Sequence, residues 1–298
     1  MNKPLNKKSF SVIFFGSQKD SLFILKKLLS LSYLTVELVV TQAPRPSGRK
    51  KLLTPTPVGE FAQNNNLPLF TPQRLDPKNQ QKISQLQPAL GILAAYGQII
   101  PPRLIKIFPK GIINIHPSLL PKFRGPAPVA QAILNGQDTT GTTLFLLDEK
   151  IDHGPIIAQA KIAINPKDTK EFLTRRLFLL GSQLLDQKLP DFLTGKIKPQ
   201  PQNHQQATFT KLLSRKDGYL EVGQIKKALM GDQKLTNEID RKIRAFYPWP
   251  GTYTMINDQR VKIISAHQEK QSLKIDLVQF PGRQPIPWNK NLSQRLLQ

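Results

Sequence analysis

Apolar residues occur along the first two thirds of the chain in short runs that alternate with segments of helical spacing. Runs rich in β-branched and aromatic residues predict strands, and apolar residues three or four positions apart predict helices. The expected strands are 9–17, 34–41, 67–72, 89–97 and 111–116, and the expected helices are 21–32, 58–66, 78–87 and 169–195. Runs that are apolar throughout are typical of strands covered on both faces, as in a parallel sheet. The pattern therefore predicts an α/β fold.

The rest of the pattern predicts an edge pair, a linker and a second domain. Segments 141–149 and 154–164 resemble a hairpin at one edge of the sheet. The stretch 196–210 is polar, rich in Pro and Gln and without period, which is a linker composition. A helical pattern around 222–246 and short strands then follow, at 251–257, 260–267 and 273–280. We expect a Rossmann-like domain with a largely parallel sheet at 1–200, a linker at 201–210 and a smaller β-rich domain at 211–298.

Composition changes this picture mainly through charge. The formal net charge of +23 favours polyanionic partners such as nucleic acid, although a lysine-rich surface also serves solubility, and charge alone does not separate the two. The chain has no cysteine, which excludes disulfides, thiolate metal sites and a cysteine nucleophile and is compatible with a reducing cytoplasm. No window approaches the roughly 18 consecutive apolar residues that a membrane span needs, so we expect no membrane association.

Two polar residues stand at the end of the apolar run 111–116. In a strand, Asn114 and His116 point to one face while Ile113 and Ile115 point to the other. Ligand sites in open α/β sheets lie at such strand ends, although a lone histidine is more often structural. The four histidines show no paired metal-ligand spacing, so we expect no metal. Asp152 lies between two apolar runs before a Gly-Pro turn; its competitor Asp148 is in the same loop, and spacing does not decide between them.

An Asn, a His and an Asp together can support acyl transfer to an amine. The Asn amide donates to the carbonyl oxygen as that oxygen gains charge, and a cationic His adds to the stabilisation. The Asp holds the His charged and accepts a proton, directly or through water, from the attacking amine. No G-x-S-x-G elbow and no P-loop occur, and the first βα turn has one Gly where a dinucleotide fingerprint needs three. These absences argue against a serine hydrolase and a nicotinamide enzyme.

Two further segments combine basic residues with other signals. Segment 41–57 contains Arg45, Arg49, Lys50 and Lys51 and no acidic residue. A charge run is usually a solvated surface, so a binding role stays one of two interpretations. Segment 241–254 interleaves basic residues with aromatic ones, which suits either nucleic-acid binding or packing at a domain junction.

The strings NIHPSLLPKFRGPAPVAQAIL and GTTLFLLDEKIDHGPIIAQ resemble the catalytic core of the folate-dependent formyltransferases. The resemblance implies a Rossmann-like catalytic domain, 10-formyltetrahydrofolate as formyl donor and no metal. It also implies that Asn114, His116 and Asp152 are catalytic. The residues it places beside the folate are Ser118, Leu119, Leu120 and Pro121, together with Tyr96 and Gly97 from the similar string AAYGQIIP.

The basic segment and IRAFYPWPGTYT resemble the parts of family members that act on tRNA. This likeness implies transfer of the formyl group to the α-amine of methionyl-initiator-tRNA by a cytoplasmic monomer. It also implies that the β-rich C-terminal domain is OB-like, shortened and binds tRNA. The implied tRNA contacts are Arg45, Arg49, Lys50, Lys51 and Arg244. The alternatives are a formyltransferase for amino-sugar nucleotides, a hydrolase of 10-formyltetrahydrofolate, and a non-catalytic RNA-binding protein of the same fold.

Overall fold

The computed structural model describes residues 9–48 and 50–289, which form two compact units. The first unit comprises residues up to 124, 141–161 and 175–208. The second comprises 125–140, 162–174 and the chain from 209 onward. Within the described ranges, no helix has both the length and the apolar character needed to cross a membrane. The domain boundaries expected at 200 and 211 stay a prediction.

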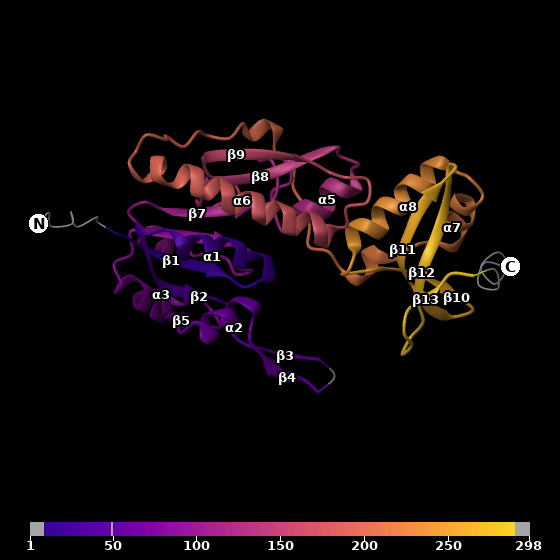
Figure 1. The fold of residues 1–298 in the computed structure, drawn as a ribbon, viewed down its shortest axis with the longest axis horizontal. Helices are drawn as coiled ribbons and strands as arrows, with labels where there is room; N and C mark the ends of the chain where they lie inside the picture. The colour runs from indigo at the N-terminus through magenta and orange to yellow at the C-terminus, as the bar shows by residue number, and fades with distance from the viewer. Residues whose placement is uncertain (1–8, 49, 290–298) are drawn as a thin grey trace, which may run out of the picture. The chain divides into compact units, whose positions relative to one another are not determined.

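A seven-stranded sheet forms the centre of the first unit (Figure 1). Its order is β5-β2-β1-β6-β7-β8-β9, and neighbours from β5 to β7 run parallel while β8 runs antiparallel to β7. The strands are β1 (Phe10–Gly16), β2 (Leu34–Val40), β5 (Leu69–Phe70), β6 (Leu90–Ala94), β7 (Ile112–His116), β8 (Thr139–Leu146) and β9 (Ile156–Ala163). The predicted α/β fold, the largely parallel sheet and the edge pair are confirmed.

Helices cover both faces of this sheet because successive residues of its strands point to opposite sides. Val12 and Phe14 of β1 belong to one apolar cluster, and Ile13 and Phe15 belong to another. The first cluster includes residues of α1 (Leu22–Ser30), α2 (Pro57–Asn64) and α6 (Lys170–Leu193). The second includes residues of α3 (Pro77–Ser84) and α4 (Pro102–Ile105). Burial on both faces explains why these strands carry no polar alternation.

The basic segment 41–57 is more ordered than the loop expected from its composition. It forms a hairpin of β3 (Arg45–Ser47) and β4 (Leu52–Thr54), which projects from the first unit in Figure 1. Gly48 supplies a positive φ of 68° at the turn, a conformation that glycine adopts without a steric penalty. The strands of the hairpin are exposed, including Leu52 and Leu53 at 65% and 72%.

The second unit contains an antiparallel sheet of order β10-β11-β12-β13 in its described part. Its strands are β10 (Thr252–Ile256), β11 (Gln259–Glu269), β12 (Ser272–Gln279) and β13 (Ile286–Pro287), and the unit also holds α5 (Pro128–Leu134). The single helical pattern expected around 222–246 is two helices, α7 (Val222–Leu229) and α8 (Gln233–Phe246). Gly231, with φ 103°, separates them. The β-rich character predicted for this region is confirmed.

Two adjacent leucines of α1 test the packing of the first core. Leu28 is 1% exposed within the first apolar cluster, whereas Leu29 is 42% exposed. We expect Leu28→Ala to lower the free energy of unfolding by about 2–5 kcal/mol because it leaves a cavity, and Leu29→Ala to change it by less than about 0.5 kcal/mol. Urea unfolding followed by circular dichroism measures both, and equal effects would contradict the assigned helix face.

Candidate active site

Strand β7 presents the two polar residues that the sequence singled out. Ile113 and Ile115 belong to the apolar cluster on one face, so Asn114 and His116 point to the other. Both are buried, at 8% and 5% exposure. Pro117 follows directly, and the strand ends at His116. The His116 Nε2 lies 3.1 Å from the main-chain oxygen of Phe123. Because a carbonyl only accepts, this contact requires a proton on Nε2 and turns Nδ1 toward other partners.

The group that lies nearest to Nδ1 of His116 is the Asp152 carboxylate, although the loop that carries Asp152 starts at the far end of β7 from His116. Its Oδ2 lies 3.7 Å from Nδ1 of His116. The antiparallel register sets Leu146, at the end of β8, opposite Ile113, whereas His116 is opposite Thr143. Those positions are roughly 10 Å apart along the strand. The loop between β8 and β9 must therefore fold back along the sheet to bring Asp152 to His116.

Backbone geometry at the D-x-G turn makes this return possible. Asp152 has φ 46°, in the left-handed region that Asp tolerates better than most residues. A Cβ at Gly154 would overlap the main-chain oxygen of Leu146, so the close approach requires glycine. The amide of Leu146 donates to Pro155, which closes the base of the loop at 3.0 Å.

The structure distinguishes Asp152 from its competitor Asp148. Asp148 Oδ2 lies 2.6 Å from Nδ1 of His153, and the His153 ring stacks on His204 with centroids 4.0 Å apart. Loss of hydration, and then the charges of His153 and Arg124, lower the pKa of His204 from its usual value. His204 is therefore neutral at pH 7, and its Nδ1 accepts a hydrogen bond from Arg124 at 2.9 Å.

Two residues at this site were missed by sequence reasoning. Arg124 is 3% exposed and Gln202 is 6% exposed, and the Arg124 Nη2 donates to the Gln202 Oε1 at 2.7 Å. Gln202 in turn donates to the main-chain oxygens of Asp152 and Gly154, at 3.0 and 2.7 Å. Burial lowers the pKa of Arg124, while the nearby carboxylates of Asp152 and Asp148 raise it. Arg124 lies three residues after the Ser-Leu-Leu-Pro stretch at 118–121, and this closeness is a signal that could have identified it. Gln202 lies in a Gln-rich segment, and no feature of the sequence distinguishes it from its neighbours.

The residues predicted to line a folate site lie at two neighbouring positions of the first unit. Thr143 accepts from the amide of Leu120 and donates to the main-chain oxygen of Ser118, at 3.1 and 2.6 Å. Gln159 also donates to Leu120, so this loop is rigidly held. Leu119 and Pro121 are partly exposed, whereas Ser118 and Leu120 are buried.

The other predicted folate residues follow β6. The Tyr96 ring is 1% exposed and packs edge-on against Phe15, and its hydroxyl has no hydrogen-bond partner among the described residues. Burial strongly raises the pKa of this phenol. Gly97 is exposed with φ 80°. Ser17 donates to the Tyr96 main-chain oxygen at 2.8 Å, so the first βα turn supports this position.

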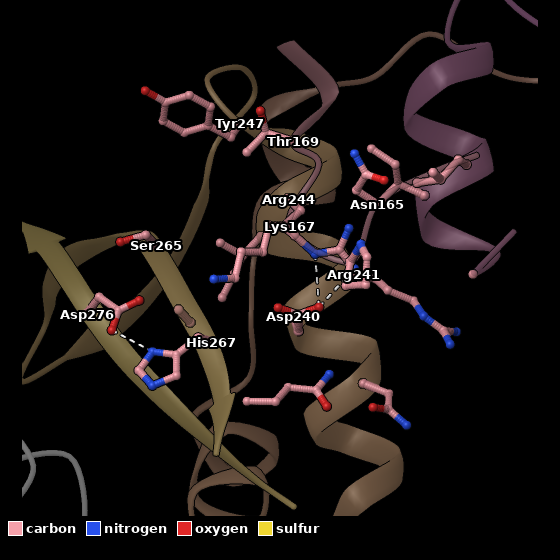
Figure 2. Close-up of a pocket in the computed structure, with 18 of the residues that line it drawn as sticks. Asn165, Lys167, Thr169, Asp240, Arg241, Arg244, Tyr247, Ser265, His267 and Asp276 are labelled. Carbon is pink, nitrogen blue, oxygen red and sulfur yellow. Dashed lines mark hydrogen bonds and ion pairs between the residues drawn. The ribbon is translucent and has the colours of Figure 1, made fainter. Parts of the chain in front are cut away.

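The residues predicted to contact tRNA lie in both units. Arg45, Lys50 and Lys51 are exposed on the β3–β4 hairpin and its turn, and Arg49 lies outside the described residues. Arg244 is on α8, beside a cavity of about 850 Å³ in the second unit (Figure 2). Its guanidinium pairs with Asp240 at 2.9 Å and donates to the main-chain oxygen of Asp168. Arg244 is thus already engaged inside its own unit.

Chemically, the first unit brings together an amide donor, an imidazole and a carboxylate. Asn114 and His116 offer donors to an oxygen that gains negative charge, and Asp152 offers a proton acceptor. No cluster of three metal-ligating side chains occurs among residues 9–48 and 50–289. The arrangement suits acyl transfer to an external amine, with no nucleophile supplied by the chain.

Comparison with known proteins agrees with this chemistry. Residues 10–189 match the Formyl transferase family and residues 233–284 match the Formyl transferase, C-terminal domain family. A relative from Chloroflexus aurantiacus, named methionyl-tRNA formyltransferase, is 43% identical over 86% of this chain and 79% of its own length. A protein of the same name from Roseiflexus castenholzii is 43% identical over 87% of this chain and 80% of its own.

A solved structure shares the fold at lower identity. The N-formyltransferase from Helicobacter canadensis, in complex with folinic acid and dTDP-3-aminofucose, has a TM-score of 0.64 and 19% identity, and the match covers 87% of each chain. From the family match and the identity to its relatives, the chain belongs to the formyl transferase family.

Proposed function

We propose that this protein transfers a formyl group from 10-formyltetrahydrofolate to the α-amine of methionyl-initiator-tRNA. The observation that carries the proposal is 43% identity over 256 residues to a relative named methionyl-tRNA formyltransferase. The Helicobacter canadensis enzyme, whose complex contains an amino-sugar nucleotide, is only 19% identical, which supports a shared fold alone. Buried Asn114 and His116, with partly buried Asp152 beside His116, support the same reaction class.

Each residue of the group has a role that its position allows. 10-Formyltetrahydrofolate supplies the formyl group when bound. Asn114 donates a hydrogen bond to the formyl oxygen as negative charge develops there, and His116 in its cationic form adds to that stabilisation. Asp152, 3.7 Å from His116, stabilises the imidazolium and accepts the proton that the attacking amine loses, and the nitrogen of the departing tetrahydrofolate takes up a proton as its bond to the formyl carbon breaks. The 118–121 loop and the Tyr96–Gly97 turn hold the folate beside these residues.

Charge supports a nucleic-acid substrate. A net charge of +23 favours association with a polyanion, and the β3–β4 hairpin presents Arg45, Lys50 and Lys51 to solvent. Arg49 belongs to the same proposed contact, as does Arg244 in the C-terminal tRNA-binding domain. We further propose that the protein acts in translation initiation as a cytoplasmic monomer and needs no metal.

The acceptor is tested by following formyl-methionine on an acid gel after incubation with 10-formyltetrahydrofolate and charged methionyl-tRNA. We expect formylation that requires the charged tRNA. Uncharged tRNA, no tRNA and a dTDP-amino-sugar serve as controls. Folate turnover without tRNA would instead establish the hydrolase, and formylation of the sugar alone would establish the sugar-nucleotide alternative.

The catalytic roles are tested with His116→Ala and Asp152→Asn. We expect each to lower kcat by about 10²–10³-fold, because each removes stabilisation specific to the transition state. The equilibrium binding of tRNA should stay near that of the wild type. Asp148→Asn is the matched control from the same loop and should cost less than about tenfold. A larger loss for Asp148→Asn than for Asp152→Asn would reverse the assignment.

The hairpin contact is tested with Lys50→Gln/Lys51→Gln. We expect weaker tRNA binding and a salt dependence of log K shallower by about 1–2 units, since each phosphate contact contributes roughly one unit. The control is Lys78→Gln/Lys198→Gln, at two exposed lysines of the first unit outside the hairpin. Titrations at several salt concentrations measure the slope. The same slope in both double variants would return the hairpin to an ordinary solvated surface.

A further inference from the structure

A short segment after α6 contacts both sides of the active site. On one side, Thr208 accepts from the amide of Phe123 through Oγ1 and from the amide of Arg124 through its main-chain oxygen, each at 2.8 Å. Phe123 is the residue whose main-chain oxygen meets His116. On the other side, Gln202 meets the loop that carries Asp152.

The Gln202 side chain uses its whole hydrogen-bonding capacity at this position. Its amide nitrogen has two hydrogens, and both go to main-chain oxygens of the Asp152 loop, at Asp152 and Gly154. Its oxygen accepts twice from Arg124, from Nε at 3.2 Å and from Nη2 at 2.7 Å. A fork of this kind fixes the amide plane, because rotation would break bonds on both sides at once.

These contacts close a ring around the reacting groups. It runs from His116 to the Phe123 carbonyl, along the chain to Arg124, through Gln202 to the main chain of Asp152, and back to His116 through the carboxylate. Every member belongs to the first unit. The loop that carries Asp152 must fold back along the sheet, and the ring is what holds the main chain of this loop at the turn.

We propose that Gln202, oriented by Arg124, is a positioning residue that sets the Asp152 carboxylate against His116. Gln202 does not touch the reacting atoms and acts through the main chain of the Asp152 loop. The assignment rests on the proposed function for its kinetic consequences. The structural part of the proposal, that the Gln202 side chain fixes the main chain of residues 152–154, does not depend on which substrate the protein uses.

Gln202→Glu separates positioning from folding. The carboxylate still accepts from Arg124, but it offers no N–H and turns an oxygen toward the carbonyls of Asp152 and Gly154. We expect the fold to persist with a lower melting midpoint, because two main-chain oxygens lose their donor, while the loop shifts. Displacement of a reacting group by about 1 Å costs up to about 100-fold, so kcat should fall about 10- to 100-fold, with KM for both substrates within about twofold of the wild type.

Gln200→Glu is the matched control, because it makes the same change two residues earlier. Gln200 is exposed, and its side-chain amide donates only to the main-chain oxygen of Lys198 among the described contacts. We expect wild-type kcat and KM for this variant. A Gln202→Glu enzyme with the same kcat as Gln200→Glu would overturn the proposal.

A double variant tests whether Arg124 acts through Gln202. Arg124→Lys keeps the positive charge but loses the pair of hydrogen bonds from Nε and Nη2 to Gln202, so it should also lower kcat. If Arg124 acts through Gln202, the kcat of Arg124→Lys/Gln202→Glu is no lower than that of the slower single variant. Fold-losses that multiply would mean that Arg124 acts by another route, which contradicts the ring.

A measurement without substrate tests the positioning role of Gln202 independently of the proposed function. In ¹H–¹⁵N spectra, the backbone signals of residues 152–154 should shift in Gln202→Glu and stay in place in Gln200→Glu. If the wild type formylates no methionyl-tRNA, the proposed function fails while the spectra still decide the positioning role. Unmoved signals in Gln202→Glu would overturn that role whatever the enzyme's activity.

Discussion

The antiparallel register between β7 and β8 is the constraint on which the site depends. It pairs His116 with Thr143 and leaves the end of β8 beside the start of β7. A carboxylate in the following loop would therefore lie far from His116 if the loop continued outward. The 3.7 Å approach of Asp152 to His116 exists because the loop turns back, with a left-handed residue at Asp152 and a glycine at 154. The chemistry of the site is thus a consequence of strand direction and loop return.

Buried polar groups make this return specific. Asn114, His116, Arg124 and Gln202 are all less than 9% exposed, and a buried polar group that loses its partner costs about 1–3 kcal/mol. A shifted loop would leave the amide hydrogens of Gln202 and its acceptors unpaired together. The hydrogen bonds that satisfy the polar groups of the segment 202–208 therefore also select one position of the loop that carries Asp152. Stability and orientation at this site have a common physical origin.

Charged groups are arranged differently at the candidate site and on the β3–β4 hairpin. At the site, the guanidinium of Arg124 lies near the carboxylates of Asp152 and Asp148, and these carboxylates lie beside the imidazole rings of His116 and His153. On the β3–β4 hairpin, basic residues are exposed in a segment without acidic residues. Fixed pairs orient groups for chemistry, whereas an exposed charge acts over a Debye length of roughly 10 Å and attracts a polyanion. The net charge of +23 is thus compatible with a site that is locally balanced.

The sequence by itself determined the layered α/β fold, since continuous apolar runs that alternate with segments of helical spacing are typical of strands covered by helices on both faces. It also determined the shared face of Asn114 and His116, because the period of a strand is two residues. Spacing along the chain did not separate Asp148 from Asp152, which have equivalent turn chemistry, and only the tertiary structure shows that Asp152 lies beside His116 while Asp148 lies beside His153. Likewise, composition describes 196–210 as a polar, linker-like stretch, yet Gln202 within it is buried against the site. A glutamine's role depends on which main-chain oxygens face it, and those oxygens come from a loop about 50 residues away in the sequence, a proximity that only the folded chain creates.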